Sequence, residues 1–168
     1  MSSLFSHIFI PLAVLFIFSE KFKLDPKKIV ILSFFGILPD IDIFLFHRAS
    51  FHNIFILIVP ILIYILTRDK NFGIICFYLT SHLVLDIFNG GIFSLYPFYE
   101  NVFYVRTEIL FNQSNFIPLV EYGISDKIEN MGKGEGAISS ENVGIVLLLV
   151  IVSILSKIKY KKIVKYIV

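Results

Sequence analysis

The sequence predicts an all-α integral membrane protein in which about five transmembrane helices form one bundle and one domain, residues 1–168. Hydrophobic residues make up 57% of the chain and charged residues only 17%, with a mean hydropathy of +0.83. Soluble domains carry more charge and fewer apolar residues. Apolar stretches recur along the chain, and most basic residues lie in every second connection between them. These three observations place the protein in a bilayer.

Each apolar stretch is a candidate span, because a helix needs about 20 apolar residues to cross the hydrocarbon core. Several are shorter, the third most of all, and local bilayer thinning can accommodate them. The first has no preceding basic residue and no following small-residue cleavage site, so we expect a retained helix and not a secretory signal. The stretches are residues 4–19, 29–46, 54–66, 72–88 and 143–156.

The basic residues predict the orientation of the bundle. Three connections that share one side of the five-span arrangement hold most of the 15 Lys and Arg residues, and the positive-inside rule makes that side cytoplasmic. We therefore expect the N-terminus outside and residues 157–168 as a basic cytoplasmic tail. The cytoplasmic residues are Lys21, Lys23, Lys27, Lys28, Arg68, Lys70, Lys157, Lys159, Lys161, Lys162 and Lys165; the outer ones are Arg48, Arg106, Lys127 and Lys133.

All four histidines and three aspartates fall at one depth of this arrangement, near its outer face. Ionisable residues in apolar segments are costly and indicate function, and imidazole with carboxylate is a donor set that suits zinc, manganese or iron. Because the topology was derived from Lys and Arg alone, the clustering is an independent observation. The residues are His7, Asp40, Asp42, His47, His52, His82 and Asp86.

The spacing of these residues is consistent with a shared site. His82 and Asp86 are four residues apart, so they project from one face of a helix. Asp40 and Asp42 would diverge on a regular helix, but Pro39 before them predicts a distorted or ending one, which lets both carboxylates turn inward. Residues 47–52 bring two imidazoles and the guanidinium of Arg48 into a short connection. Arg48 cannot bind a metal, but it can hold an anionic oxygen of a substrate.

Each residue also has a reading that involves no metal. His7 can be hydrogen-bonded at the interface, and Asp40 and Asp42 can cap a turn. His47 and Arg48 can be solvated at the membrane edge, and His82 with Asp86 can form a proton relay or an interhelical bond. The convergence of all these residues at one depth favours a metal site over these separate explanations.

Four blocks of sequence resemble the family described as LexA-binding, inner-membrane-associated, metal-dependent hydrolases. The blocks are Ser6-His7, residues 38–42 (Leu-Pro-Asp-Ile-Asp), residues 47–52 (His-Arg-Ala-Ser-Phe-His), and residues 81–86 (Ser-His-Leu-Val-Leu-Asp) followed by Asn89-Gly90-Gly91 and Tyr96-Pro97-Phe98. The resemblance covers roughly residues 1 to 100 and implies a multi-pass membrane hydrolase. Ala49, Ser50 and Asn89 depart from the Gly, Thr and Thr usual in the family, which affects local turn geometry and one contact around the ligands.

The donor set and the resemblance together predict a metal-dependent hydrolase that acts on an ester or phosphoester of a lipid or another membrane-proximal substrate. We expect one or two divalent ions, zinc first, with His52, His82, Asp86 and Asp40 as ligands. His7, His47 and Asp42 would be further or orienting ligands. Asp42 would accept a proton, and Arg48 would bind the anionic oxygen.

Two other functions remain open at this stage, a divalent-ion transporter and a membrane adaptor with a structural metal site. Residues 89–142 are expected as an outer loop region that acts as a partial lid. The one cysteine, Cys76, excludes an internal disulfide and a cysteine-based zinc site. Membrane lipids are the expected partners, and nothing in the chain predicts nucleic-acid binding.

Overall fold

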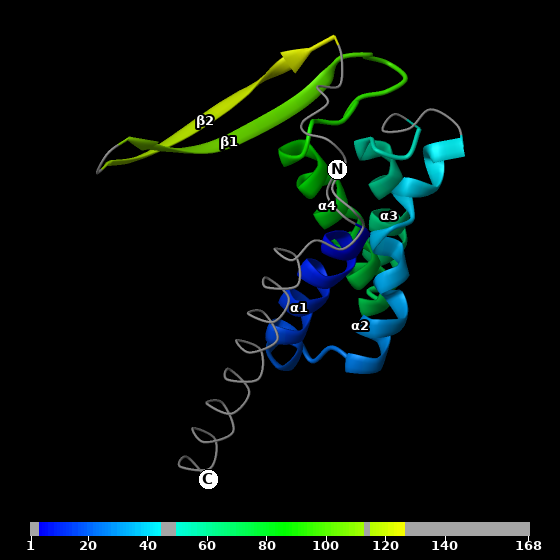
Figure 1. Ribbon diagram of the computed structural model, residues 1–168. Helices are drawn as coiled ribbons and strands as arrows, with labels where there is room; N and C mark the ends of the chain where they lie inside the picture. Colours follow the sequence, from blue (N-terminus) through cyan, green and yellow to red (C-terminus); the bar gives the residue numbers. More distant parts are fainter. Residues whose placement is uncertain (1–3, 45–49, 113–114, 127–168) are drawn as a thin grey trace.

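The computed structural model describes residues 4–44, 50–112 and 115–126, which form a helical bundle with a β-hairpin at one end (Figure 1). Helix α4 is central, since it contacts α1, α2, α3 and the first strand. The elements in chain order are α1 (Leu4–Phe22), α2 (Pro26–Leu32), the 3₁₀ helices η1 (Ser33–Gly36), η2 (Pro39–Phe44) and η3 (Ile54–Leu57), α3 (Ile58–Thr67), α4 (Lys70–Phe88), β1 (Val102–Asn112) and β2 (Asn115–Ser125).

Helices α1 and α4 are antiparallel neighbours. At one end, His7 near the start of α1 lies 3.4 Å from Asp86 near the end of α4, measured between Nε2 and Oδ1. At the other end, the ammonium of Lys70 donates a hydrogen bond to the carbonyl oxygen of Phe22 at 2.9 Å. Between these ends, Leu15, Ile29, Ile74 and Tyr78 form the buried core. The bundle therefore has two polar ends separated by an apolar middle.

Aspartate caps begin two of the helices. Asp25 precedes Pro26, whose fixed φ suits the first helical position, and its carboxylate accepts a hydrogen bond from the Lys27 amide at 2.9 Å. Asp69 caps α4 in the same way, through the Asn71 amide at 2.9 Å. Arg68 ends α3 in the left-handed conformation, with φ of 56°. Asp25 therefore fixes the turn between α1 and α2, and Arg68 and Asp69 fix the turn between α3 and α4.

The second apolar stretch, predicted over residues 29–46, is broken and not one helix. It begins as α2, tightens to η1 at Ser33, and resumes as η2 at Pro39. Proline has no amide hydrogen and disfavours helical backbone in the residue before it, so the regular ladder cannot pass through Leu38 and Pro39. The helix distortion expected before Asp40 is confirmed. It begins at Ser33, where the α-helix gives way to η1, which ends at Gly36.

Two of the described helices are long and apolar enough to cross a membrane, Phe5–Phe22 and Lys70–Phe88, while the helix Ile54–Thr67 is shorter. Only 28% and 39% of the residues in the two long windows are buried, unlike the core helix of a soluble protein. Large apolar side chains such as Ile31, Leu62 and Leu66 are exposed on the helices. A bilayer is the solvent in which such a surface is stable. The fifth predicted stretch, residues 143–156, lies outside the described residues.

The all-α prediction is corrected in residues 102–125, which form a two-stranded antiparallel sheet inside the region expected to be an outer loop. Every residue from Val102 to Asn112 has a partner in β2. The segment contains alternating aromatic, β-branched and polar residues that favour strands. Figure 1 shows the hairpin extending sideways from the end of the bundle where α4 ends.

The hairpin is tied to α4 through a glycine turn. The amide of Ile92 donates to Phe103 at 3.0 Å, and the amide of Phe103 donates back at 2.9 Å. Gly91 has a φ of 89°, and a Cβ there would collide with the side chain of Val102 and lie 2.7 Å from the carbonyl oxygen of Phe103. Only glycine permits this approach.

Gly36→Ala should destabilise the protein, because a Cβ at Gly36 would lie 2.6 Å from the carbonyl oxygen of His7. Overpacking of this kind costs about 1–3 kcal/mol. The control is Gly73→Ala, whose Cβ would meet only the Tyr64 ring at 3.4 Å. Thermal unfolding in detergent should show a lower midpoint for Gly36→Ala than for Gly73→Ala. Equal midpoints would contradict the close approach of η1 to α1.

Candidate metal centre

Four of the predicted residues meet in one cluster at the hairpin end of the bundle. Asp40 comes from η2, His52 from the connection before η3, and His82 and Asp86 from α4. One donor atom from each residue lies within 4.8 Å of the others. His52, His82 and Asp86 are buried, whereas the side chain of Asp40 is 25% exposed. The cluster therefore has one accessible member.

The distances between the donor atoms are short and similar. The Nε2 atoms of His52 and His82 are 3.0 Å apart. Asp86 Oδ2 lies 3.1 Å from the first of these nitrogens and 3.2 Å from the second. Asp40 Oδ1 lies 3.4 Å from His52 Nε2 and 3.7 Å from His82 Nε2. Five of the six distances between the four donor atoms are thus known, and none of the five exceeds 3.7 Å. These distances are the edges of a tetrahedron with a donor atom at each corner.

These edges match the size of a tetrahedral metal site. With nitrogen or oxygen donors about 2.0–2.1 Å from a zinc ion, the donors of a tetrahedron are about 3.3–3.4 Å apart. The measured edges, 3.0 to 3.7 Å, bracket that length. Two imidazoles and two carboxylates are also a donor chemistry that zinc, manganese and iron accept. The residues therefore fit a divalent metal ion in both geometry and chemistry.

The tautomer of neutral His82 is fixed by a backbone carbonyl. Its Nδ1 lies 2.6 Å from the oxygen of Gly36, and because a carbonyl oxygen can only accept, Nδ1 must carry the hydrogen. In a neutral imidazole the Nε2 lone pair then points at His52, Asp40 and Asp86. A histidine that binds a metal usually donates its other ring hydrogen in this way. Gly36 thus orients a predicted ligand.

His52 is positioned by the polar turn that follows it. The side-chain nitrogen Nδ2 of Asn53 donates a hydrogen bond to the carbonyl oxygen of Ser50 at 2.8 Å. Its side-chain oxygen Oδ1 accepts a hydrogen bond from the backbone amide of Phe55 at 3.0 Å and so caps η3. The amide of Ile54 donates to the carbonyl oxygen of Ser94 at 3.0 Å. These bonds fix the backbone next to His52 and hold the connection against residues 92–99.

Asp86 uses its two carboxylate oxygens in two directions. Oδ2 faces His52 and His82, while Oδ1 faces Nε2 of His7 at 3.4 Å. The ring of His7 stacks on that of His82, with centroids 3.9 Å apart. The backbone oxygen of Asp86 accepts hydrogen bonds from Asn89 and Gly91, each at 3.0 Å, which close the end of α4. His7 is therefore a neighbour of the cluster that contacts one of its carboxylates.

The cluster requires positive charge. Two carboxylates in a largely buried site are costly unless they are compensated. A divalent cation between the four donors would balance the charge of both carboxylates.

The structure brings five of the predicted site residues close together, while the side chains of the other three lie outside the described residues. The five are His7, Asp40, His52, His82 and Asp86. His47 and Arg48 lie outside the described residues, and so does the side chain of Asp42, whose backbone belongs to η2. Sequence reasoning missed the orienting carbonyl of Gly36 and the cap by Asn53. The Asn53-Ile54 pair, a capping residue before an apolar run, was the available signal.

The comparisons with known proteins agree with a membrane setting. None of the curated proteins and none of the solved structures matches the chain significantly. A family model does match, over residues 1–163, and this range includes every member of the cluster. The chain belongs to the family of YdjM inner membrane proteins.

Proposed function

We propose that this protein is a multi-pass membrane hydrolase that uses a divalent metal ion held by Asp40, His52, His82 and Asp86. The observation that carries the proposal is the convergence of four donor atoms at the edge lengths of a tetrahedral site. The sequence blocks that resemble LexA-binding, inner-membrane-associated hydrolases support the hydrolytic assignment. Zinc is the first choice of metal, with manganese or iron as alternatives and a second ion adjacent to His7.

A bound divalent ion would polarise a substrate oxygen and make water a better nucleophile near neutral pH. The chain's own residues supply the rest. His82, oriented by Gly36, and His52, fixed by Asn53, hold the centre rigidly. Asp40 lies on the exposed side, where a substrate approaches. Asp42, two residues further along η2, accepts the proton, and Arg48, in the connection that leads to His52, binds the anionic oxygen of the substrate.

The substrate class follows from the position of the cluster. We assign the cluster to the outer half of a five-span bundle with the N-terminus outside and the C-terminus cytoplasmic. Support comes from the antiparallel α1 and α4, which place the cluster at one end and the basic residues Lys23, Arg68 and Lys70 at the other. A site at that depth is reached by an ester or phosphoester whose polar part lies at the interface, such as a lipid.

A membrane adaptor with a structural metal is the second candidate, because four protein donors can saturate a tetrahedral ion and leave no open position. Exposure of Asp40 argues for the enzyme, since a carboxylate at the open side can yield its position to substrate. A path for ion transport is less well supported. Within the described residues, the region between the two polar ends is occupied by Leu15, Ile29, Ile74 and Tyr78.

His82→Ala should abolish stoichiometric metal binding, because it removes one of four donors and the one that Gly36 orients. We expect metal content after purification in detergent, measured by elemental analysis, to fall about tenfold or more. Ser81→Ala, the neighbouring position on α4, is the matched control and should retain the metal. Metal-free natural protein with an intact fold would refute the proposal.

Asp42→Asn should lower kcat for the hydrolysed ester or phosphoester about a hundredfold, the typical contribution of a proton-transferring carboxylate. Its metal content should stay at the natural level, whereas Asp40→Asn should lose metal as well. Turnover is measured on a panel of phosphoester and lipid substrates in detergent. Natural protein that holds metal but hydrolyses nothing on the panel would favour the adaptor.

The proposed orientation predicts the accessibility of two positions to a membrane-impermeant thiol reagent. In a Cys76→Ser background, Glu100→Cys should be labelled from outside intact cells, because residue 100 follows α4 at the cluster end. Lys27→Cys, at the start of α2, should be labelled only after the membrane is opened. The reverse pattern would invert the topology, and labelling of both from outside would exclude the three spans proposed between them, because an odd number of spans places the two positions on opposite sides.

A further inference from the structure

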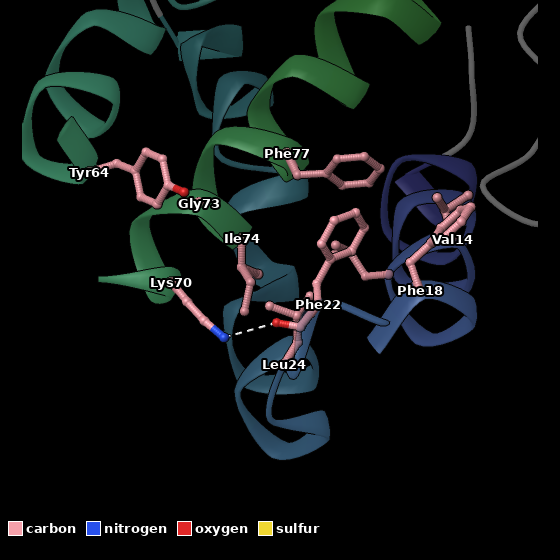
Figure 2. Close-up of a pocket in the computed structure, with 10 residues that line it drawn as sticks. Val14, Phe18, Phe22, Leu24, Tyr64, Lys70, Gly73, Ile74 and Phe77 are labelled. Atoms are coloured by element: carbon pink, nitrogen blue, oxygen red, sulfur yellow. Dashed lines mark hydrogen bonds between the residues drawn. The ribbon is translucent and has the colours of Figure 1, made fainter. Parts of the chain in front are cut away.

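Two adjoining cavities lie at the end of α1 and α4 that is remote from the metal cluster. The first has a volume of about 270 Å³ and an apolar wall (Figure 2). Phe18, Phe22 and Phe77 line it together with Ile74 and Tyr64. Phe22 is 15 residues from His7 along α1, a distance of about 20 Å at the helical rise, so this cavity is separate from the cluster.

The second cavity is polar and opens beside the first. Its volume is about 330 Å³, and it shares Leu24, Lys70 and Ile74 with the apolar cavity. Four basic side chains line it, Lys23, Lys28, Arg68 and Lys70. Together the two cavities offer an apolar slot with a cationic mouth.

The mouth keeps a net positive charge. Asp25 and Asp69 line the same cavity, where they accept hydrogen bonds from backbone amides as helix caps, and their two negative charges leave the lining with a net charge of +2. Within the described residues neither forms an ion pair with the four cations. Lys70 instead donates to the neutral carbonyl oxygen of Phe22 at 2.9 Å (Figure 2) and to that of Lys23 at 3.3 Å. An anion is the complement of such a surface.

Two of the four cations occupy a backbone conformation that usually selects glycine. Lys23 has a φ of 52° and Arg68 a φ of 56°, at the ends of α1 and α3. Glycine is the common residue at such helix ends, because a Cβ is sterically unfavourable in the left-handed conformation. Both positions retain a basic side chain that faces the same cavity.

We propose that these two cavities form a binding site for an anionic phospholipid. Part of an acyl chain occupies the apolar cavity, and the phosphate lies among Lys23, Lys28, Arg68 and Lys70. The ends of membrane-crossing helices lie at the level of lipid head groups, so a phospholipid reaches both cavities at once. Lys70 connects the two parts of the site, since it lines both cavities.

Lipid selectivity in purified full-length protein tests the site. Protein in non-ionic detergent is titrated with phosphatidylglycerol and, in parallel, with phosphatidylcholine of the same acyl chains. Native mass spectrometry counts the bound lipids and gives the dissociation constant for each. We expect one phosphatidylglycerol bound at least about fivefold more tightly than phosphatidylcholine.

Neighbouring lysines provide a matched pair of variants. Lys28→Gln removes a charge from the cavity and should weaken phosphatidylglycerol binding about fivefold. Lys27→Gln removes the same charge from the next residue, which does not line the cavity, and should leave binding unchanged. Gly73→Leu fills the apolar cavity and should weaken binding of both lipids, whereas Gly73→Ala, with room beside Tyr64, should not.

Four results would overturn the proposal. Equal affinity for the two lipids, or equal losses in Lys27→Gln and Lys28→Gln, would show general surface attraction in place of a site. Unchanged binding in Gly73→Leu would exclude the apolar cavity. A dimer that forms in place of lipid binding, visible in the same mass spectra, would show that a second copy covers these residues.

Discussion

The hydrogen bond between His82 and the carbonyl oxygen of Gly36 joins α4 to η1 and orients the ring of His82 in the cluster. It exists because Gly36 has no side chain and approaches the backbone of α1 beside His7. The carbonyl determines which nitrogen of His82 carries hydrogen, and so directs the other nitrogen at His52, Asp40 and Asp86. A backbone contact thus orients one of the four donor atoms of the cluster.

The identity of the candidate site residues was easier to predict from the sequence than the backbone structure that carries them. His82 and Asp86 share a helical face by spacing alone, and the Lys and Arg distribution placed His7 and Asp40 at the same depth. The break at Pro39 was foreseen, but its start at Ser33 was not, because tertiary contact of Gly36 with α1 favours the tighter turn there. The hairpin was missed because residues 102–125 pair with each other through main-chain bonds that apolar patterning does not report.

The two ends of the bundle treat acidic residues differently. Asp25 and Asp69 accept hydrogen bonds from backbone amides at helix starts, and they are outnumbered by the four cations around them. Asp40 and Asp86 face imidazoles. The same residue type therefore caps helices at one end of the bundle and faces histidines at the other.

Gly91 joins the hairpin closely to the end of α4. β1 fits against this glycine without room for a Cβ, and Ile92 and Phe103 exchange two hydrogen bonds. Asp86 lies in the last turn of α4, and its backbone oxygen accepts a hydrogen bond from the amide of Gly91 itself. A substitution that displaces β1 from this glycine would consequently also disturb the part of α4 that carries the carboxylate of the cluster.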